Sequence, residues 1–119
     1  MAKNNSEVTS DVVNRFNEAT SRHDVDGMMD LMSENVVFES TGPAPDGQKI
    51  EGQSAVRKVW EELFQSTPEA KFTAEELFAS NDRCVVRWSY DFGKGHIRGV
   101  DIIRVENGKI AEKLSYVKG

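Results

Sequence analysis

The chain is short of cysteine, of proline and of long apolar runs. Its 119 residues include one cysteine, Cys84, and three prolines. A lone cysteine cannot form a disulfide within the chain, which fits a reducing compartment, and we interpret Cys84 as a buried structural thiol. No stretch approaches the roughly 20 apolar residues that span a bilayer, and no apolar leader follows Met1. We therefore expect a cytoplasmic protein with no membrane partner.

Positive charge is also scarce. Lysine and arginine number 15 against 20 acidic residues, for a net charge of -5, and the basic residues form no cluster. A nucleic-acid surface needs many cations that contact phosphates, so nucleic acid is not an expected partner. No histidine, cysteine or acidic pair has metal-ligand spacing, and Gly93-Lys94-Gly95 is too short for a phosphate-binding loop. We expect neither a metal nor another cofactor.

Hydrophobic residues make up 38% of the chain, which suits one packed domain over residues 1–119. The first half has helical periodicity. It predicts a helix that begins at Ser6 or Thr9 and ends near His23, a shorter helix over 24–32, and a third from Ser54 to about Pro68. Residues 36–40 are predicted as a short strand, and residues 41–52 as an exposed loop.

From residue 70 onward the hydrophobic pattern changes to period two. Strands are predicted over 71–80, about 86–92, about 99–105 and 110–117, with turns between them. Along the second strand, Val86, Trp88, Tyr90 and Phe92 share one face. Helices followed by an antiparallel meander predict an α+β fold, with the helices on one face of a curved sheet.

Asp101 is the most informative residue, because it interrupts the apolar run 99–105 in the middle of a predicted strand. Burial of a carboxylate is costly unless it is paired, neutral or used for chemistry in a cavity. Its direction depends on the preceding hairpin. A loop of two or four residues places Asp101 on the face of Trp88 and Tyr90, whereas a loop of three places it opposite Arg87.

The following hairpin leaves a second choice open. A two-residue turn at 107–108 pairs Asp101 with Leu114 and brings Tyr116 diagonally within reach. A three-residue turn with a bulge places Lys113 and Ser115 beside Asp101 instead.

Two stretches resemble SnoaL-like proteins and steroid delta-isomerases of the nuclear transport factor 2-like superfamily. The first comprises Arg15-Phe16-Asn17, His23-Asp24 and residues 35–40; the second is the run His96 to Glu112. The resemblance implies a cone-shaped α+β barrel, in which three N-terminal helices pack on a strongly curved antiparallel sheet around an apolar pocket, commonly in homodimers. It is poor evidence for activity, because the fold hosts isomerases, cyclases, hydrolases, dehydratases and binding domains.

Compared residue by residue with steroid delta-isomerases, this chain keeps one of their catalytic positions. Asp101 matches the strand acid of steroid delta-isomerases, but Phe16 stands in place of their tyrosine and Ser40 in place of their base. Phenylalanine cannot donate a hydrogen bond and serine is not a base near neutral pH, so the usual isomerase chemistry should fail. Ser115 stands where limonene-epoxide-hydrolase relatives carry an acid. SnoaL-like cyclases rely chiefly on one acid at the position of Asp101.

These observations predict a small-molecule pocket protein in which Asp101 is the acid/base of an isomerase or cyclase that acts on an apolar, ring-containing ligand. Tyr90 or Tyr116 would supply a second hydrogen bond. The alternative is a non-catalytic ligand-binding or dimerisation domain, in which a tyrosine hydroxyl or Arg98 holds Asp101 structurally. The expected apolar lining is Phe16, Phe38, Trp60, Phe64, Val86, Trp88, Phe92 and Ile103.

If Asp101 points inward, its neighbours Val100 and Ile102 point outward. Arg98 and Arg104 would then surround an apolar centre, which is the composition of an interface core with a polar rim. We therefore expect a homodimer through the sheet.

Overall fold

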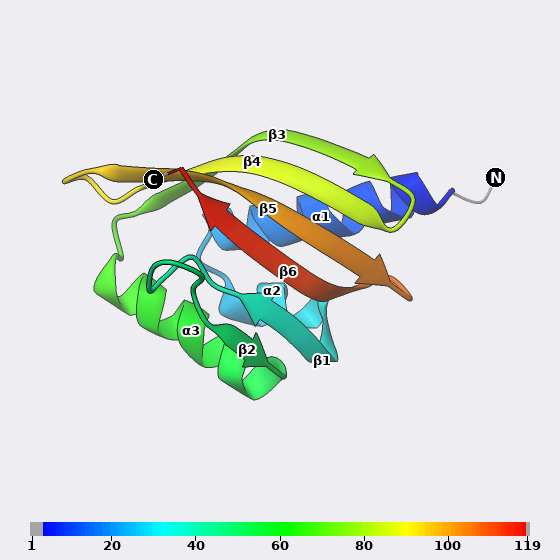
Figure 1. The fold of residues 1–119 in the computed structure, drawn as a ribbon, viewed down its shortest axis with the longest axis horizontal. Coiled ribbons are helices and arrows are strands. Elements are labelled where there is room, and N and C mark those ends of the chain that lie inside the picture. The colour runs from blue at the N-terminus through cyan, green and yellow to red at the C-terminus, as the bar shows by residue number, and fades with distance from the viewer. Residues whose placement is uncertain (1–3, 119) are drawn as a thin grey trace.

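The computed structural model describes residues 4–118 and has an α+β fold of three helices and one six-stranded sheet within them (Figure 1). Among these residues no helix is both long enough and apolar enough to cross a membrane. The helices are α1 (Asn5–Ser21), α2 (Val25–Asp30) and α3 (Gln53–Ser66). The strands are β1 (Met32–Glu39), β2 (Lys49–Glu51), β3 (Lys71–Ser80), β4 (Arg83–Asp91), β5 (His96–Glu106) and β6 (Lys109–Val117).

The strand order is β2-β1-β6-β5-β4-β3, so β2 and β3 are the edges of an open sheet. Strands β3 to β6 form the predicted antiparallel meander. Strand β1, however, pairs with β6 in parallel. Helix α1 packs against β3 and β4, and α3 packs against β1; Figure 1 shows α1 behind the long strands and α3 beside β1 and β2. The face of the sheet that the helices cover is called the inner face below.

The N-cap of helix α1 lies two residues before Ser6 and five before Thr9, the two predicted caps. The side chain of Asn4 accepts a hydrogen bond from the backbone N–H of Glu7 at 2.9 Å, so Asn4 is the N-cap. Ser6 and Thr9, the predicted caps, bind the turn between β3 and β4 instead. The hydroxyl of Ser6 accepts from the Asn81 N–H at 2.8 Å, and that of Thr9 donates to the Asn81 carbonyl at 2.7 Å. Both side chains therefore tie α1 to the sheet.

The segment between α1 and α3 differs most from its prediction. Helix α2 ends at Asp30, and β1 already begins at Met32, where a helix was expected. The predicted exposed loop contains β2, which pairs with the end of β1 and places Ile50 opposite Phe38. A three-residue strand has too little alternation to be recognised in a sequence, because only its pairing with β1 defines it.

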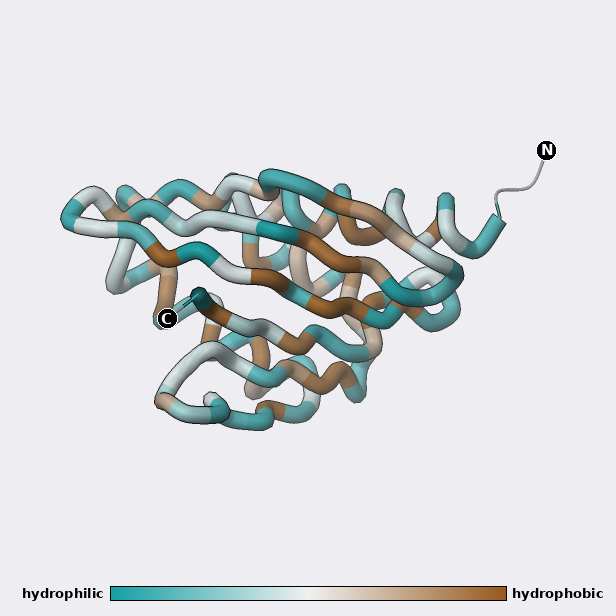
Figure 2. Tube along the Cα trace, turned by 45° about the horizontal axis from the view of Figure 1, so that its top comes forward, coloured by the Kyte–Doolittle hydropathy of each residue, from teal (hydrophilic) through white to brown (hydrophobic). Residues whose placement is uncertain are grey.

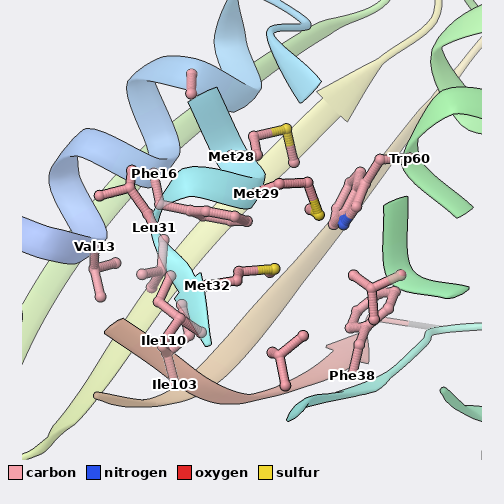
Figure 3. Close-up of a cluster of buried hydrophobic side chains, with 14 of the residues drawn as sticks. Val13, Phe16, Met28, Met29, Leu31, Met32, Phe38, Trp60, Ile103 and Ile110 are labelled. Atoms are coloured by element: carbon pink, nitrogen blue, oxygen red, sulfur yellow. The ribbon is translucent and has the colours of Figure 1, made fainter. Parts of the chain in front are cut away.

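The core lies between the helices and the inner face. Figure 2 shows hydrophobic stretches along the strands and hydrophilic segments at the turns. Met28 and Met29 of α2 are fully buried next to Phe16 of α1 (Figure 3). Across the cluster, Trp60 of α3 stacks on Phe38 of β1 with 5.5 Å between ring centroids. This aromatic side of the core borders the cavity described next.

Candidate functional site

Strand β5 carries Asp101 into the interior. Asp91 pairs with His96, so the loop between β4 and β5 has four residues, one of the two lengths expected to turn Asp101 inward. Asp101 lies opposite Val86, and Trp88 pairs with Gly99 two residues away. The acid is 2% exposed, so this carboxylate needs partners.

Those partners form a compact group, here called the polar cluster: Trp88, Asp101, Lys113 and Ser115. The indole N–H of Trp88 and the hydroxyl of Ser115 both donate to Oδ1 of Asp101, at 2.9 and 2.7 Å. The ammonium of Lys113 lies 3.3 Å from Oδ2 and donates to the Ser115 oxygen at 2.9 Å. The carboxylate is thus held by two hydrogen bonds and one buried ion pair.

Lys113 was not among the predicted site residues. It is 4% exposed, which is rare for a lysine and requires pairing. It lies opposite Phe38 on β1, and its Nζ is 4.6 Å from the centroid of that ring and 5.1 Å from the Trp60 ring. Two cation–π contacts and Asp101 together hold the charge in the interior.

A β-bulge decides which residues of β6 face inward. The Asn107-Gly108 turn has two residues, because Glu106 pairs with Lys109, but the register shifts next to it, where Arg104 pairs with Glu112 and Val105 with Ile110. The extra residue is Ala111. Beyond it Asp101 faces Ser115, so the expected pairing with Leu114 is wrong, and the bulged alternative with Lys113 and Ser115 beside Asp101 is confirmed, although the turn has two residues rather than three.

The same bulge turns Tyr116 outward. Tyr116 is 52% exposed and lies on the face of the sheet opposite to Asp101, so it cannot supply the hydrogen bond expected of it. Arg98, the other partner considered for Asp101, pairs with Glu75 at 3.2 Å. Lys113 and Ser115 therefore occupy the places for which tyrosine and arginine had been considered.

The polar cluster borders a cavity of about 570 Å³ between the helices and the inner face. Polar residues of its wall include Asn17 and Thr20 of α1 and Ser40, while Val59 and Leu63 come from α3. Six residues predicted for the site line it: Phe16, Phe38, Trp60, Trp88, Tyr90 and Asp101.

Four residues predicted as lining lie elsewhere. Val86 and Ile103 are fully buried in the core and do not line the cavity. Phe64 stacks on His23 with ring centroids 4.1 Å apart. Phe92 falls in the β4–β5 loop and is 37% exposed. Period-two alternation correctly put Val86 inside but could not distinguish core from cavity wall, because both are inner-face positions.

The hydroxyl of Tyr90 is already engaged. It lies 2.7 Å from Oγ1 of Thr67, which in turn donates to the Leu63 carbonyl at 2.7 Å. Because Thr67 has one hydroxyl proton, the Tyr90 hydroxyl is the donor to Thr67. Burial raises the pKa of Tyr90, against a smaller opposing effect of the Thr67 hydrogen bond. Tyr90 is a neutral wall residue whose proton is not free for a ligand.

Ser40 lines the cavity, and its hydroxyl is used in two hydrogen bonds rather than as a base. Its hydroxyl donates to the Gly42 carbonyl at 2.8 Å and accepts from the Gln48 N–H at 3.1 Å. These bonds shape the loop between β1 and β2. Within residues 4–118, no three histidine, cysteine or acidic side chains lie together in a way that could hold a metal ion.

Comparisons with known proteins identify the family and the fold. A family model described as a SnoaL-like domain matches residues 13–113. An NTF2-like protein of unknown function from Mesorhizobium loti is 37% identical, over 100% of this chain and 98% of that one, with a TM-score of 0.88. No protein with a curated description matches the chain.

Two further solved structures share the fold at lower identity. A protein from Kribbella flavida, provisionally assigned as a ketosteroid isomerase, is 16% identical over 99% of this chain and 83% of that one, with a TM-score of 0.85. A provisionally assigned polyketide cyclase from Sinorhizobium meliloti is 19% identical over 91% and 94%, with a TM-score of 0.75. At these identities the likeness concerns the fold alone.

Proposed function

The chain belongs to the SnoaL-like domain family, and we propose that it binds an apolar, ring-containing small molecule in the cavity between its helices and sheet. The composition of the cavity carries this proposal, because several aromatic side chains and the polar cluster line it together. A volume of about 570 Å³ lies within the range of roughly 300–1,000 Å³ typical of small-molecule sites.

The wall favours a flat ligand. Phe38 and Trp60 are stacked with an interplanar angle of 24°, and Phe16 meets Trp60 edge-on at 75°. Trp88 and Tyr90 contribute further ring surface to the wall. Rings that are held in this way offer offset-stacked and edge contacts to an aromatic or polycyclic molecule, beyond the gain from burial of its apolar surface.

A substitution that fills the cavity tests this proposal. Leu63 lines the cavity from α3, whereas Gln65 is exposed on the same helix. Calorimetric titration with naphthalene-sized ring compounds should show binding to the wild type and to Gln65→Trp, and binding at least about tenfold weaker to Leu63→Trp, since the new indole takes up cavity space. Absence of binding to the wild type, or equal binding to both variants, would contradict the proposal.

Proton transfer on the bound molecule is a second candidate function, favoured by the contact between Asp101 and Lys113 at the cavity wall. In this reaction Oδ2 of Asp101 removes a proton from a carbon next to a carbonyl group. Lys113 stabilises the enolate oxygen that forms, and the protonated Asp101 returns the proton to another carbon. The carboxylate is regenerated, and the product is an isomer of the substrate.

Hydrogen exchange on a ring ketone tests this chemistry. The wild type should accelerate exchange of the α-hydrogens of 2-tetralone for deuterium, followed by NMR in D₂O. Asp101→Asn should fall to the background rate, because the amide still accepts from Trp88 and Ser115 but cannot take a proton. Gln65→Ala, at an exposed position of α3, is the control and should retain exchange. A wild type that binds the ketone without exchange is a binding domain, the alternative expected from the sequence.

We also propose that the protein forms a homodimer through the outer face of the sheet. Ile102 is 38% exposed there, and Tyr116 on the neighbouring strand, which pairs with Val100, is 52% exposed on the same face. Apolar side chains gathered on one exposed face are typical of an interface centre.

The cytoplasmic location inferred from the single cysteine stays a prediction.

A further inference from the structure

We propose that Lys113 is the residue that holds the ligand, and that the ligand presents an uncharged carbonyl oxygen to it. This proposal rests on the binding function above and names its polar contact. Asp101 accepts two hydrogen bonds within the protein, whereas the ammonium of Lys113 keeps unused hydrogen-bonding capacity at the cavity wall.

The ammonium carries three donor hydrogens. One is donated to the Ser115 oxygen at 2.9 Å, and a second faces Oδ2 of Asp101, the ion-pair partner 3.3 Å from the nitrogen. The third has no oxygen acceptor among residues 4–118 and lies with the rings of Phe38 and Trp60 around it. All these residues line the cavity, so a ligand atom can reach the donor that the protein leaves unpaired.

Two further donors in the cavity wall lack a protein partner. Among the described residues, neither the indole N–H of Trp60 nor the side-chain N–H₂ group of Asn17 has a hydrogen-bond acceptor. Trp60 is 8% exposed and Asn17 is 6% exposed, and both line the cavity. A buried donor without an acceptor is costly. Both donor atoms are fully buried, so a ligand in the cavity reaches the ammonium of Lys113 rather than these two groups.

The charge balance indicates an uncharged acceptor. Asp101 already neutralises Lys113, so an anionic ligand would add a second negative charge beside the carboxylate, against one cation. Burial of such an uncompensated charge is disfavoured. A carbonyl oxygen accepts hydrogen bonds without adding charge. Asp101 and Ser115 are then positioning residues, which keep the ammonium between the two rings.

Three probes with the same ring separate these possibilities in the wild-type protein. They are 2-acetylnaphthalene, with a carbonyl group; 2-isopropenylnaphthalene, with a CH₂ group in place of the carbonyl oxygen; and 2-naphthoate, with a carboxylate. We expect calorimetric titration to show the ketone binding at least about tenfold more tightly than the alkene, as one hydrogen bond from a charged donor supplies. The naphthoate should bind more weakly than the ketone.

Three variants assign the preference to Lys113. The double variant Asp101→Asn with Lys113→Met should bind ketone and alkene equally, and it leaves no buried charge unpaired. Asp101→Asn alone keeps the ammonium without its counter-ion, so the naphthoate should become the tightest probe. Lys58→Met removes an exposed lysine of α3 and should behave like the wild type.

Each outcome has one meaning. Equal binding of the three probes to the wild type overturns the role of Lys113 but leaves the binding function in place. If the wild type binds the naphthoate most tightly, the proposal that the ligand is uncharged is wrong. A ketone preference that survives in the double variant assigns the contact to another donor and overturns the proposal. If no probe binds to the wild type, the binding function itself fails. The probe comparison needs only the wild type, so it remains decisive if a variant does not fold.

Discussion

Replacement of Lys113 by methionine tests the buried ion pair most directly. Methionine has a similar length and can keep its contacts with Phe38 and Trp60, but it has no charge. Asp101 would then remain 2% exposed with only the hydrogen bonds from Trp88 and Ser115. The substitution therefore isolates the effect of leaving a buried carboxylate without its counter-ion.

The expected cost is a large part of the stability of the domain. Removal of one partner of a buried ion pair costs about 3–5 kcal/mol, out of roughly 5–15 kcal/mol for unfolding of a typical domain. Two hydrogen bonds to Oδ1 remain, so we expect a loss near the lower limit, about 3 kcal/mol. Asp101→Asn added to Lys113→Met removes the unpaired charge while the amide oxygen keeps both donors. The double variant should therefore regain stability, to within about 1–2 kcal/mol of the wild type.

Urea unfolding at neutral pH measures these differences. Fluorescence of Trp60 and Trp88 and far-UV circular dichroism should give coincident transitions with equal slopes, which licenses comparison of the free energies. Lys58→Met is the control and should lie within about 0.5 kcal/mol of the wild type. A loss below about 1 kcal/mol for Lys113→Met, or a double variant no more stable than that single variant, would refute a buried pair.

Three other perturbations have expected outcomes. In Gly99→Ala the new Cβ would collide with the backbone carbonyl oxygen of Tyr116 and lie 2.6 Å from Cζ2 of Trp88. Strand β6 and the indole should therefore both move, with a loss of at least about 1–3 kcal/mol and a shifted indole N–H signal in NMR; an unshifted signal would contradict the close approach. Burial raises the pKa of Cys84 to about 11 from the ordinary 9.0, so the folded state holds this proton more tightly than the unfolded chain. The contribution of Cys84 to stability should be fully present below about pH 9 and fall by at most about 3 kcal/mol between pH 9 and 11 in urea titrations, and the stability of Cys84→Ala should fall less over this range. Ile102→Glu should convert a dimer to a monomer in light scattering, and a monomeric wild type would contradict the proposed interface.

Much of the fold could be predicted from local patterns. The third helix and the four long strands have strong periodicity of 3.6 or 2, because each buries one face along its whole length. The short β2 and the parallel pairing of β1 with β6 could not be predicted in this way, since both depend on contacts with segments distant in the sequence. The N-cap Asn4 was missed because Ser6 and Thr9 are equally good capping types and are used by the turn at Asn81.

The candidate site, like the fold, could be predicted from the sequence only in part. Alternation of apolar residues around Asp101, with the resemblance to SnoaL-like proteins, determined that this acid points into the interior beside Trp88. Its partners were decided only by the tertiary structure. One extra residue, Ala111, shifts the register of β6, and this shift brings Lys113 and Ser115 inside in place of Leu114 and Tyr116.

The physical reason is that side-chain direction in a strand has period two, so a single inserted residue reverses every position beyond it. The sequence contains both sets of residues and permits either register. Pairing of β6 with β5 and β1 selects the set that gives Asp101 a counter-ion, and it thereby replaces an isolated acid by a Lys113–Asp101 pair at the wall of an aromatic cavity.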